Sequence, residues 1–203
     1  GTYVVYDRDQ LDAPRDDGFW AASEKILVQE VRNVHLPQRI VAYLDTDKAI
    51  GLNTTNAIIL KDTVQLDIHY VMAIVASKLM NKFFQVCYID NHIATQYLAS
   101  IPIRRIAFTT PEDQRARLLA EAQAFYNNVI LSVTEGSQHS GVILRPLTFE
   151  AEGPKCSNVI LSATEGSNAL LAFTAARLAA DPEQSDVIHD LLAYLAEQMT
   201  ALH

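Results

Sequence analysis

The chain has 203 residues, of which 49% are hydrophobic and 20% charged, which is typical of a globular protein that can bury a core of its own. Its net charge of −8 argues at first sight against a polyanionic partner such as nucleic acid. Cys87 and Cys156 lack metal-ligand spacing, and the most apolar run, residues 70–84, is short and interrupted by lysines. We therefore expect a soluble, cytoplasmic protein with no membrane segment.

The acidic residues are unevenly distributed along the chain. Residues 24–105 contain nine Lys or Arg and seven Asp or Glu, whereas residues 111–203 contain five and twelve. The argument from net charge therefore applies mainly to the C-terminal part. The middle of the chain is neutral to slightly basic.

The first half predicts a leader followed by a sheet. Residues 1–23 are rich in Asp and lack periodicity, so we interpret them as a leader or linker that Phe19 and Trp20 pin to the surface. Short segments rich in β-branched residues predict strands over 25–31, 39–44 and 57–61. Apolar residues at helical spacing predict one amphipathic helix over 68–84, and the apolar run 101–108 predicts a further strand.

The second half predicts helices around an insertion. Thr110 followed by Pro111 predicts a helix start, with the helix running to about Tyr126. Two further helices are predicted over 169–180 and after the Asp-Pro pair at 181–182. The decapeptides 128–137 and 158–167 are nearly identical, and we interpret them as strand–turn pieces of an insertion over about 127–167.

These elements predict the class α+β. The expected organisation is a leader over 1–23, a mixed β-sheet domain with packed helices over 24–108, and a mostly helical C-terminal region over 109–203.

The sequence lacks the motifs of common catalytic sites. It contains no Gly-rich phosphate loop, no Rossmann fingerprint and no G-x-S-x-G elbow. Its six histidines do not show metal-ligand spacing, and the pair His189–Asp190 is predicted to lie on a solvated helix surface. The Asn/Asp-Pro-Pro-aromatic tetrapeptide with which amino-methylating DNA enzymes hold a flipped base is also missing. The chain alone is therefore not expected to catalyse a reaction or to bind a metal or cofactor.

The polar loops of the middle region suggest recognition. They are rich in Asn, Gln, Ser, Thr and Arg, which pair with base edges without requiring a high net charge.

Four motifs in order resemble one known family. They are the strand "KILVQEV" at 25–31, the turn and strand "NTTNAIILK" at 53–61, the helix motif "ASKL" at 76–79 and "LASIPI" at 98–103. This set resembles the TaqI-like C-terminal specificity domain, the target-recognition region of adenine-specific DNA methyltransferases and of fused restriction-methylation enzymes. The family has Asn where this chain has Ala76. The likeness covers residues 24–126 and 168–203, since the tail around 176–199 resembles the fused enzymes.

The resemblance implies sequence-specific binding of double-stranded DNA, with the chemistry elsewhere. The parent enzyme would carry an N-terminal methyltransferase part that uses S-adenosylmethionine, and possibly a nuclease. Phosphate contacts are predicted for Lys25, Arg32, Arg39, Lys48 and Lys61, with Arg104 and Arg105 at the exit of the domain. Base reading is predicted for the loop residues Arg32, Asn33, His35, Gln38, Asn53, Thr54, Thr55, Asn56, Asn91 and His92.

Two alternatives remain open at this point. The chain could be a protein-interaction module whose acidic helical tail docks a catalytic subunit. It could also be a hydrolase that uses His92 or Cys87.

Overall fold

The protein is described by a computed structural model over residues 7, 9, 17–51, 54–138 and 168–201. The chain forms two compact units. The first comprises Gly1–Arg104 together with Ala193–His203, and the second comprises Arg105–Leu192. Within the described residues, no helix combines the length and apolarity needed to span a bilayer.

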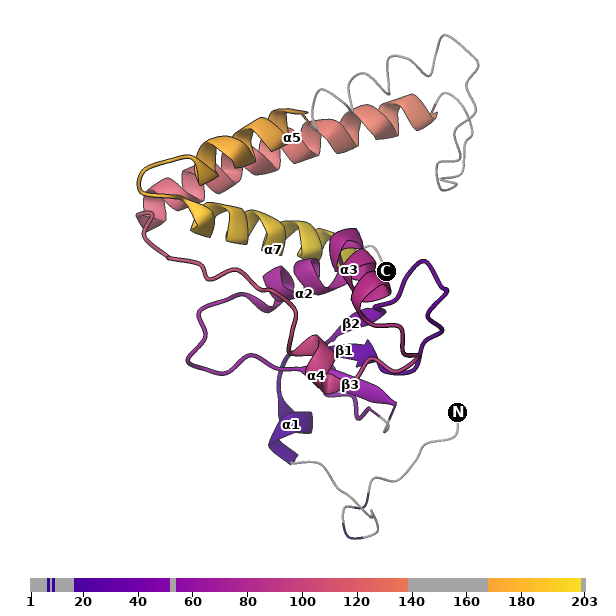
Figure 1. The fold of residues 1–203 in the computed structure, drawn as a ribbon. Coiled ribbons are helices and arrows are strands. Elements are labelled where there is room, and N and C mark those ends of the chain that lie inside the picture. Colours follow the sequence, from indigo (N-terminus) through magenta and orange to yellow (C-terminus); the bar gives the residue numbers. More distant parts are fainter. Residues whose placement is uncertain (1–6, 8, 10–16, 52–53, 139–167, 202–203) are drawn as a thin grey trace. The chain divides into compact units, whose positions relative to one another are not determined.

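The first unit is built on a small antiparallel sheet. Its strands are β1 (Lys25–Gln29), β2 (Ala42–Asp45) and β3 (Thr55–Ile58), in the order β2-β1-β3 (Figure 1). Leu27 of β1 lies opposite Tyr43 of β2 and Ala57 of β3. The α+β class is confirmed, but the described sheet is purely antiparallel, whereas a mixed sheet was expected.

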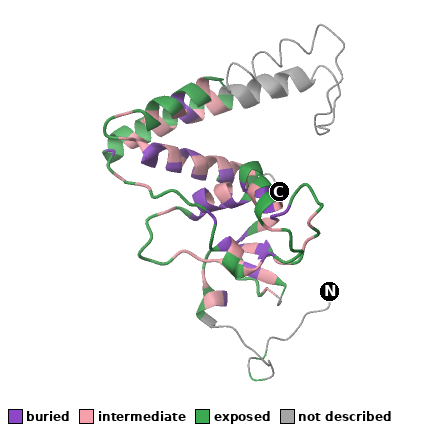
Figure 2. Cartoon of the chain, viewed as in Figure 1, coloured by how far each residue is buried: buried purple, intermediate pink, exposed green. Residues whose placement is uncertain are grey.

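Two helices pack beside this sheet where one was predicted. They are α2 (Ile68–Ala76) and α3 (Lys78–Cys87). Ser77 interrupts them because its backbone is extended and its hydroxyl caps α3 by accepting a hydrogen bond from Met80 N. α2 contacts β1 and β2, and its Val71 and Val75 are buried together with Ile26 and Val28 of β1. Figure 2 shows this buried core of β1 and α2.

A buried ion pair lies at the start of the sheet. Lys25 Nζ is 2.6 Å from Asp45 Oδ2 and also donates to the carbonyl of Trp20, which belongs to the short helix α1 (Asp17–Ala21). Burial alone would raise the pKa of Asp45. The hydrogen bonds from Lys25 and from the backbone N–H groups of Asp47 and Ala49, together with the charge of Lys25, outweigh it and lower that pKa.

The predicted strand over 101–108 is wrong. Residues 101–109 form no strand pairing, although Ile101 is buried. They follow α4 (Thr95–Leu98), which is anchored by the stacking of Tyr97 on Tyr88 at a centroid distance of 4.3 Å. An apolar segment becomes a strand only where a neighbouring strand offers hydrogen-bond partners, and none of the described strands pairs with these residues.

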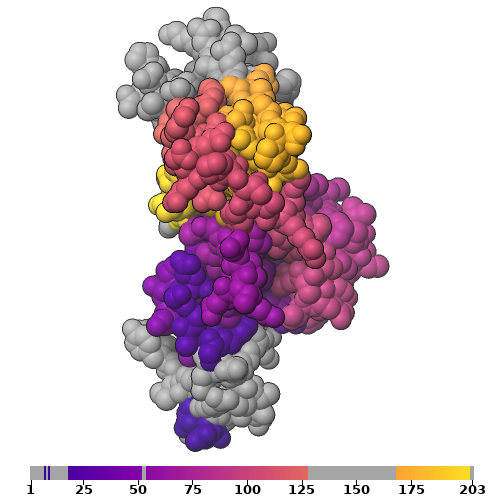
Figure 3. All heavy atoms as spheres, turned by 90° about the vertical axis from the view of Figure 1, so that its left-hand side faces the viewer, coloured from indigo at the N-terminus to yellow at the C-terminus, as the bar shows by residue number. Residues whose placement is uncertain are grey.

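The described part of the second unit is mostly helical, as predicted. It contains α5 (Glu112–Gln138), helical residues 168–178, and the start of α7 (Ser185–Ala201). Phe125 of α5 meets Phe173 at a centroid distance of 6.3 Å, and the two helices lie side by side in Figure 3. α5 continues through the decapeptide at 128–137, so the strand expected there is wrong, and its copy at 158–167 lies outside the described residues. Extending an established helix avoids the cost of nucleation, because each added residue forms one further hydrogen bond.

A buried carboxylate ties the start of α5 to the start of α7. Asp186 accepts hydrogen bonds from Thr110 N at 2.8 Å, from Thr110 Oγ1 at 2.7 Å and from Val187 N at 2.9 Å. Thr110, which the sequence predicted to cap the following helix, donates both its backbone N–H and its hydroxyl to Asp186.

The pair His189–Asp190 is part of the packed interior of this unit. His189 is buried, its Nδ1 lies 2.8 Å from Asp190 Oδ1, and its ring meets the edge of Phe108. Asp190 also pairs with Arg115 Nε at 2.9 Å. The expectation of a solvated surface pair is therefore wrong.

The buried ion pair gives a testable prediction for stability. Because the pKa of Asp45 is lowered in the folded state, its ionised form stabilises the fold above the ordinary carboxyl pKa of about 3.9. That stabilisation is lost as the pH falls through the lowered value. Asp45→Asn leaves Lys25 buried without a counter-charge, which should cost about 3–5 kcal/mol near neutral pH. Urea unfolding followed by the fluorescence of Trp20, the only tryptophan in the chain, measures this.

Asp47→Asn is the matched control for this measurement. Asp47 is exposed in the same turn and contributes only its backbone N–H to Asp45, so its neutralisation should change the urea midpoint little. Equal midpoints for the two variants would contradict the role of the buried pair.

Candidate functional site

Three polar loops meet at one end of the sheet, where β1 ends and β2 and β3 begin. Gln29 at the end of β1 pairs with Thr55 at the start of β3, and Val28 pairs with Ala42 at the start of β2. The bridge between Val31 and His92 adds a third loop. We call residues 29–38, 54–55 and 90–92 the loop end of the sheet. Sequence predicted these loops separately, and the fold brings them together.

Backbone hydrogen bonds join the three loops. Glu30 N donates to Thr54 O at 2.9 Å, and Arg32 N donates to Asn91 O at 2.8 Å. The side chain of Asn91 adds a bond, because its Oδ1 accepts from Val34 N at 3.2 Å. The loops therefore form one connected surface.

Arg39 fastens two of these loops from beneath. Its guanidinium is fully buried and donates from Nη1 to Arg32 O at 2.5 Å and from Nη2 to Asp90 O at 2.6 Å. Its Nε has no hydrogen-bond partner among the described residues. Burial lowers the pKa of Arg39, the charge of Arg32 lowers it further, and Asp90 opposes this; a guanidinium nevertheless remains charged.

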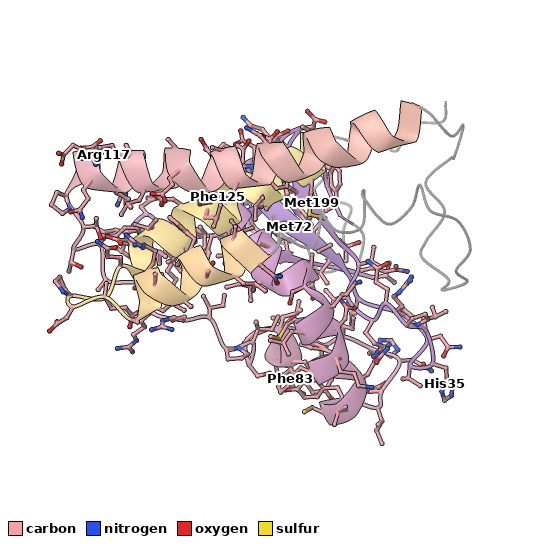
Figure 4. All side chains as sticks on the ribbon, turned by 90° about the horizontal axis from the view of Figure 1, so that it is seen from above. His35, Met72, Phe83, Arg117, Phe125 and Met199 are labelled. Carbon is pink, nitrogen blue, oxygen red and sulfur yellow. The ribbon has the colours of Figure 1, made fainter. Side chains whose placement is uncertain are left out.

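α3 supports the first loop from the side. Gln85 Nε2 donates to the carbonyls of Leu36 and Pro37 at 3.1 and 2.8 Å, and Asn81 Oδ1 accepts from Ile40 N at 2.7 Å. In Figure 4 the loop that carries His35 lies beside α3. Sequence reasoning missed Asn81 and Gln85, although two amides one turn apart on an otherwise amphipathic helix were a usable signal.

Several polar groups at the loop end face solvent. The exposed residues are Asn33, His35, Gln38, Thr54, Asn91 and His92. Asn33 Oδ1 accepts from His35 N, which fixes a tight turn. Arg32 is half-buried and donates from Nε to Gln38 O at 2.6 Å, while His92 Nδ1 lies 3.7 Å from the carboxylate of Glu30. Amide, imidazole and hydroxyl groups on a fixed backbone can donate to and accept from planar polar ligands.

Burial contradicts the predicted DNA contacts of three residues. Lys25 and Arg39 are fully buried and use their charges within the fold, so neither can contact a phosphate in this structure. Asn56 is also buried, where it donates to Ile93 O at 2.7 Å and accepts from Thr95 Oγ1 at 3.0 Å. Thr55 is half-buried within β3, and Asn53 lies outside the described residues.

Two predicted phosphate contacts lie away from the loop end. Lys48 and Lys61 are exposed and follow the ends of β2 and β3, at the opposite end of the sheet. A hollow of about 320 Å³ at that end is lined by Glu24, Asp67 and His69 among others. The carboxylates of Glu24 and Asp67 repel phosphate and oppose the attraction of Lys48 and Lys61 at that end.

Arg104 and Arg105 are both exposed where the first unit gives way to the second along the chain. Burial raises the pKa of Tyr70, and the charge of Arg104 opposes that rise. Neither arginine belongs to the three segments that form the loop end, 29–38, 54–55 and 90–92.

No cluster of three or more His, Cys, Asp or Glu that could hold a metal ion is found in the described part of the chain. Cys87 is exposed on α3, and His92 lies in the third loop.

The comparisons with known proteins agree with the motifs. The family described as TaqI-like C-terminal specificity domain matches residues 1–103, about half of the chain. No curated protein and no solved structure gives a match.

Arg39 gives a prediction for the rigidity of the loop end. Arg39→Met should leave the carbonyls of Arg32 and Asp90 without a donor, at a cost of about 1–3 kcal/mol for each. Hydrogen exchange should then accelerate at the amides of Val34 and Ile93, while amides of α5 keep their protection. Arg39→Lys keeps the charge but supplies a single ammonium group. Its exchange rates at these amides should lie between those of Arg39→Met and those of the unsubstituted chain. Unchanged exchange in Arg39→Met would show that Arg39 does not hold the loops.

Proposed function

The chain belongs to the family of TaqI-like C-terminal specificity domains, and from this membership we propose that the loop end of the sheet reads the bases of double-stranded DNA. Domains of this family are target-recognition domains of restriction-modification enzymes and are not themselves catalytic. The observation that carries the proposal is the convergence of three polar loops at one end of one sheet, joined by backbone and side-chain hydrogen bonds.

The exposed groups of the loop end suit base edges. Asn and Gln side chains pair with adenine through two hydrogen bonds, and His or Thr can donate to or accept from several bases. We assign base reading to Asn33, His35, Gln38, Thr54 and His92, all exposed. Asn33 and Asn91 take part through their amide nitrogens, since their Oδ1 atoms already accept from His35 N and Val34 N, respectively.

A rigid loop end reduces the entropy that binding must remove. Ordering a flexible loop on DNA costs free energy for each side chain immobilised. The bonds from Arg39 and Gln85 fix the loop backbone before DNA arrives. The preference for particular bases then depends on side chains held by a rigid loop backbone.

The catalytic part of the proposed enzyme lies elsewhere in a larger protein. We propose that the parent is an adenine-specific methyltransferase or a fused restriction-methylation enzyme. Its N-terminal part would bind S-adenosylmethionine and flip the target base. The present chain would contribute the choice of DNA sequence.

A protein-interaction module is the second candidate, and one observation favours it. Leu79, Val86 and Ile89 expose most of their surface on and just after α3. Exposed apolar side chains that gather on one helix are typical of a contact with another protein.

Base reading is tested with single loop variants. Duplexes selected from a random library by the full chain define the preferred site. Asn33→Ala and His35→Ala should each cost about 1–3 kcal/mol on that site and relax the preference for particular bases. Binding to a scrambled duplex should change little, and the salt dependence should stay the same because no phosphate contact is lost.

Val64→Ala is a suitable control, since Val64 is exposed outside the loop end. Equal losses on selected and scrambled duplexes would mean that the loop residues hold the backbone and do not read bases. Failure of the full chain to bind any duplex at low salt would instead favour the protein-interaction candidate.

The absence of catalysis is a separate prediction. The purified chain should transfer no methyl group from S-adenosylmethionine to DNA and should not cleave DNA. A radioactive methyl-transfer assay and a plasmid cleavage assay measure this. If methyl transfer or cleavage co-purifies with the chain and is lost in a loop variant, the chain itself is catalytic. The assignment of the chemistry to another part of the parent would then be wrong.

A further inference from the structure

Helix α3, whose Gln85 bonds to the first loop, also carries two lysines. Asn81 and Gln85 bond to the loop, and Met80 and Phe84 are buried. At about 100° per residue, Lys78 and Lys82 lie within about 60° of Gln85 around the helix axis, on the side away from the buried residues. Both lysines are exposed. Along the helix axis, Lys82 lies about 4.5 Å and Lys78 about 10.5 Å before Gln85, whose amide donates to the loop.

These lysines form the cationic edge of α3. The helix contains no Asp or Glu in its sequence KLMNKFFQVC, so neither charge is neutralised within it. They stand one turn apart, about 6 Å along the axis. Two cations at this spacing, next to a surface that presents amides and imidazoles, suit a phosphate backbone that flanks a base-reading loop.

The loop end needs cations from a neighbouring element. Arg39 is buried beneath it and Arg32 is half-buried and bonded to Gln38 O, so the loops expose little positive charge of their own. Glu30 and Asp90 add negative charge there. DNA affinity depends mainly on neutralised phosphates. Lys48 and Lys61 follow the strand ends at the other end of the sheet, away from these loops.

We propose that Lys78 and Lys82 bind the DNA phosphates beside the loop end, and that α3 is the backbone-contacting edge of the interface. This inference rests on the proposed function. It replaces Lys25, Arg39, Lys48 and Lys61, which sequence reasoning had assigned to phosphate, with a pair that sequence reasoning left out.

The test compares two matched double variants of the full chain. Lys78→Gln/Lys82→Gln removes two charges beside the loop end. Lys48→Asn/Lys61→Gln removes two charges at the other end, with Asn at position 48 because Lys48 has a φ of 58°, which Asn tolerates. Both variants change the net charge equally, so a general effect of charge on DNA attraction cancels in the comparison.

The measured quantity is the slope of log K against log salt for a selected and a scrambled duplex. Removing both α3 lysines should reduce the slope by about 1.8 and weaken binding roughly 10–100-fold at 0.1 M salt, equally on the two duplexes. The Lys48/Lys61 control should keep the slope of the unsubstituted chain. Lys78→Arg/Lys82→Arg should restore it, because the charge is kept.

Each remaining outcome overturns the inference. If the salt slope falls equally in the two double variants, the effect is one of general charge. If it falls only in the Lys48/Lys61 variant, DNA binds at the opposite end of the sheet. Unchanged slopes in both would leave α3 as a protein contact, a result that Leu79→Asp would then probe. If the unsubstituted chain binds no duplex, the proposed function itself fails, and that result is distinguishable from failure of the α3 assignment alone. All variants alter exposed side chains, so equal urea midpoints should confirm that the fold is intact.

Discussion

The candidate site depends on one buried guanidinium. The two Nη atoms of Arg39 donate to backbone carbonyls of two different loops, Arg32 O and Asp90 O, and Asp90 lies 51 residues from Arg39 in the sequence. A charge of this kind is costly to bury unless its donors are used, and Nε remains without a partner among the described residues. Such an arrangement stabilises one loop geometry over others, because any movement of either loop exposes unpaired carbonyls and an unpaired cation together. Asn91, Gln85 and Asn81 then hold the same loops by bonds to their backbone.

Burial of basic residues within the fold reduces the number that can contact a polyanion. The middle of the chain holds a small excess of basic over acidic residues, yet two of its cations, Lys25 and Arg39, are buried to stabilise the sheet and the loops. The positive charge that remains for a polyanion is divided between α3, the far end of the sheet and the exit at Arg104 and Arg105. Net charge alone therefore says little about where a duplex can bind, because position relative to the recognition loops decides which cations contribute.

Much of the fold was predictable from local pattern. The three strands, the amphipathic helices and the helical nature of the second unit follow from periodicity and β-branched content, which are properties of a few consecutive residues. The errors arose where distant residues decide. Residues 101–108 look like a strand, but none of the described strands pairs with them. His189 was expected in solvent and is packed against Phe108. The break between α2 and α3 was missed as well. Ser77 is a residue type that caps helices, but the apolar residues at helical spacing continue past it and suggested a single helix.

For the candidate site, sequence by itself determined the family and the chemistry of the loops. The four ordered motifs pointed to a specificity domain, and the amides and hydroxyls of the three loops are a matter of residue type alone. The tertiary structure decided which of those groups meet, because antiparallel pairing brings the end of β1 to the starts of β2 and β3. It also decided which of them remain available: Lys25, Arg39 and Asn56 are the right residue types for DNA contact, but each is buried with its hydrogen bonds directed inward. Residue type fixes what a side chain can bind, whereas burial, which depends on contacts between distant segments, fixes whether a ligand can reach it.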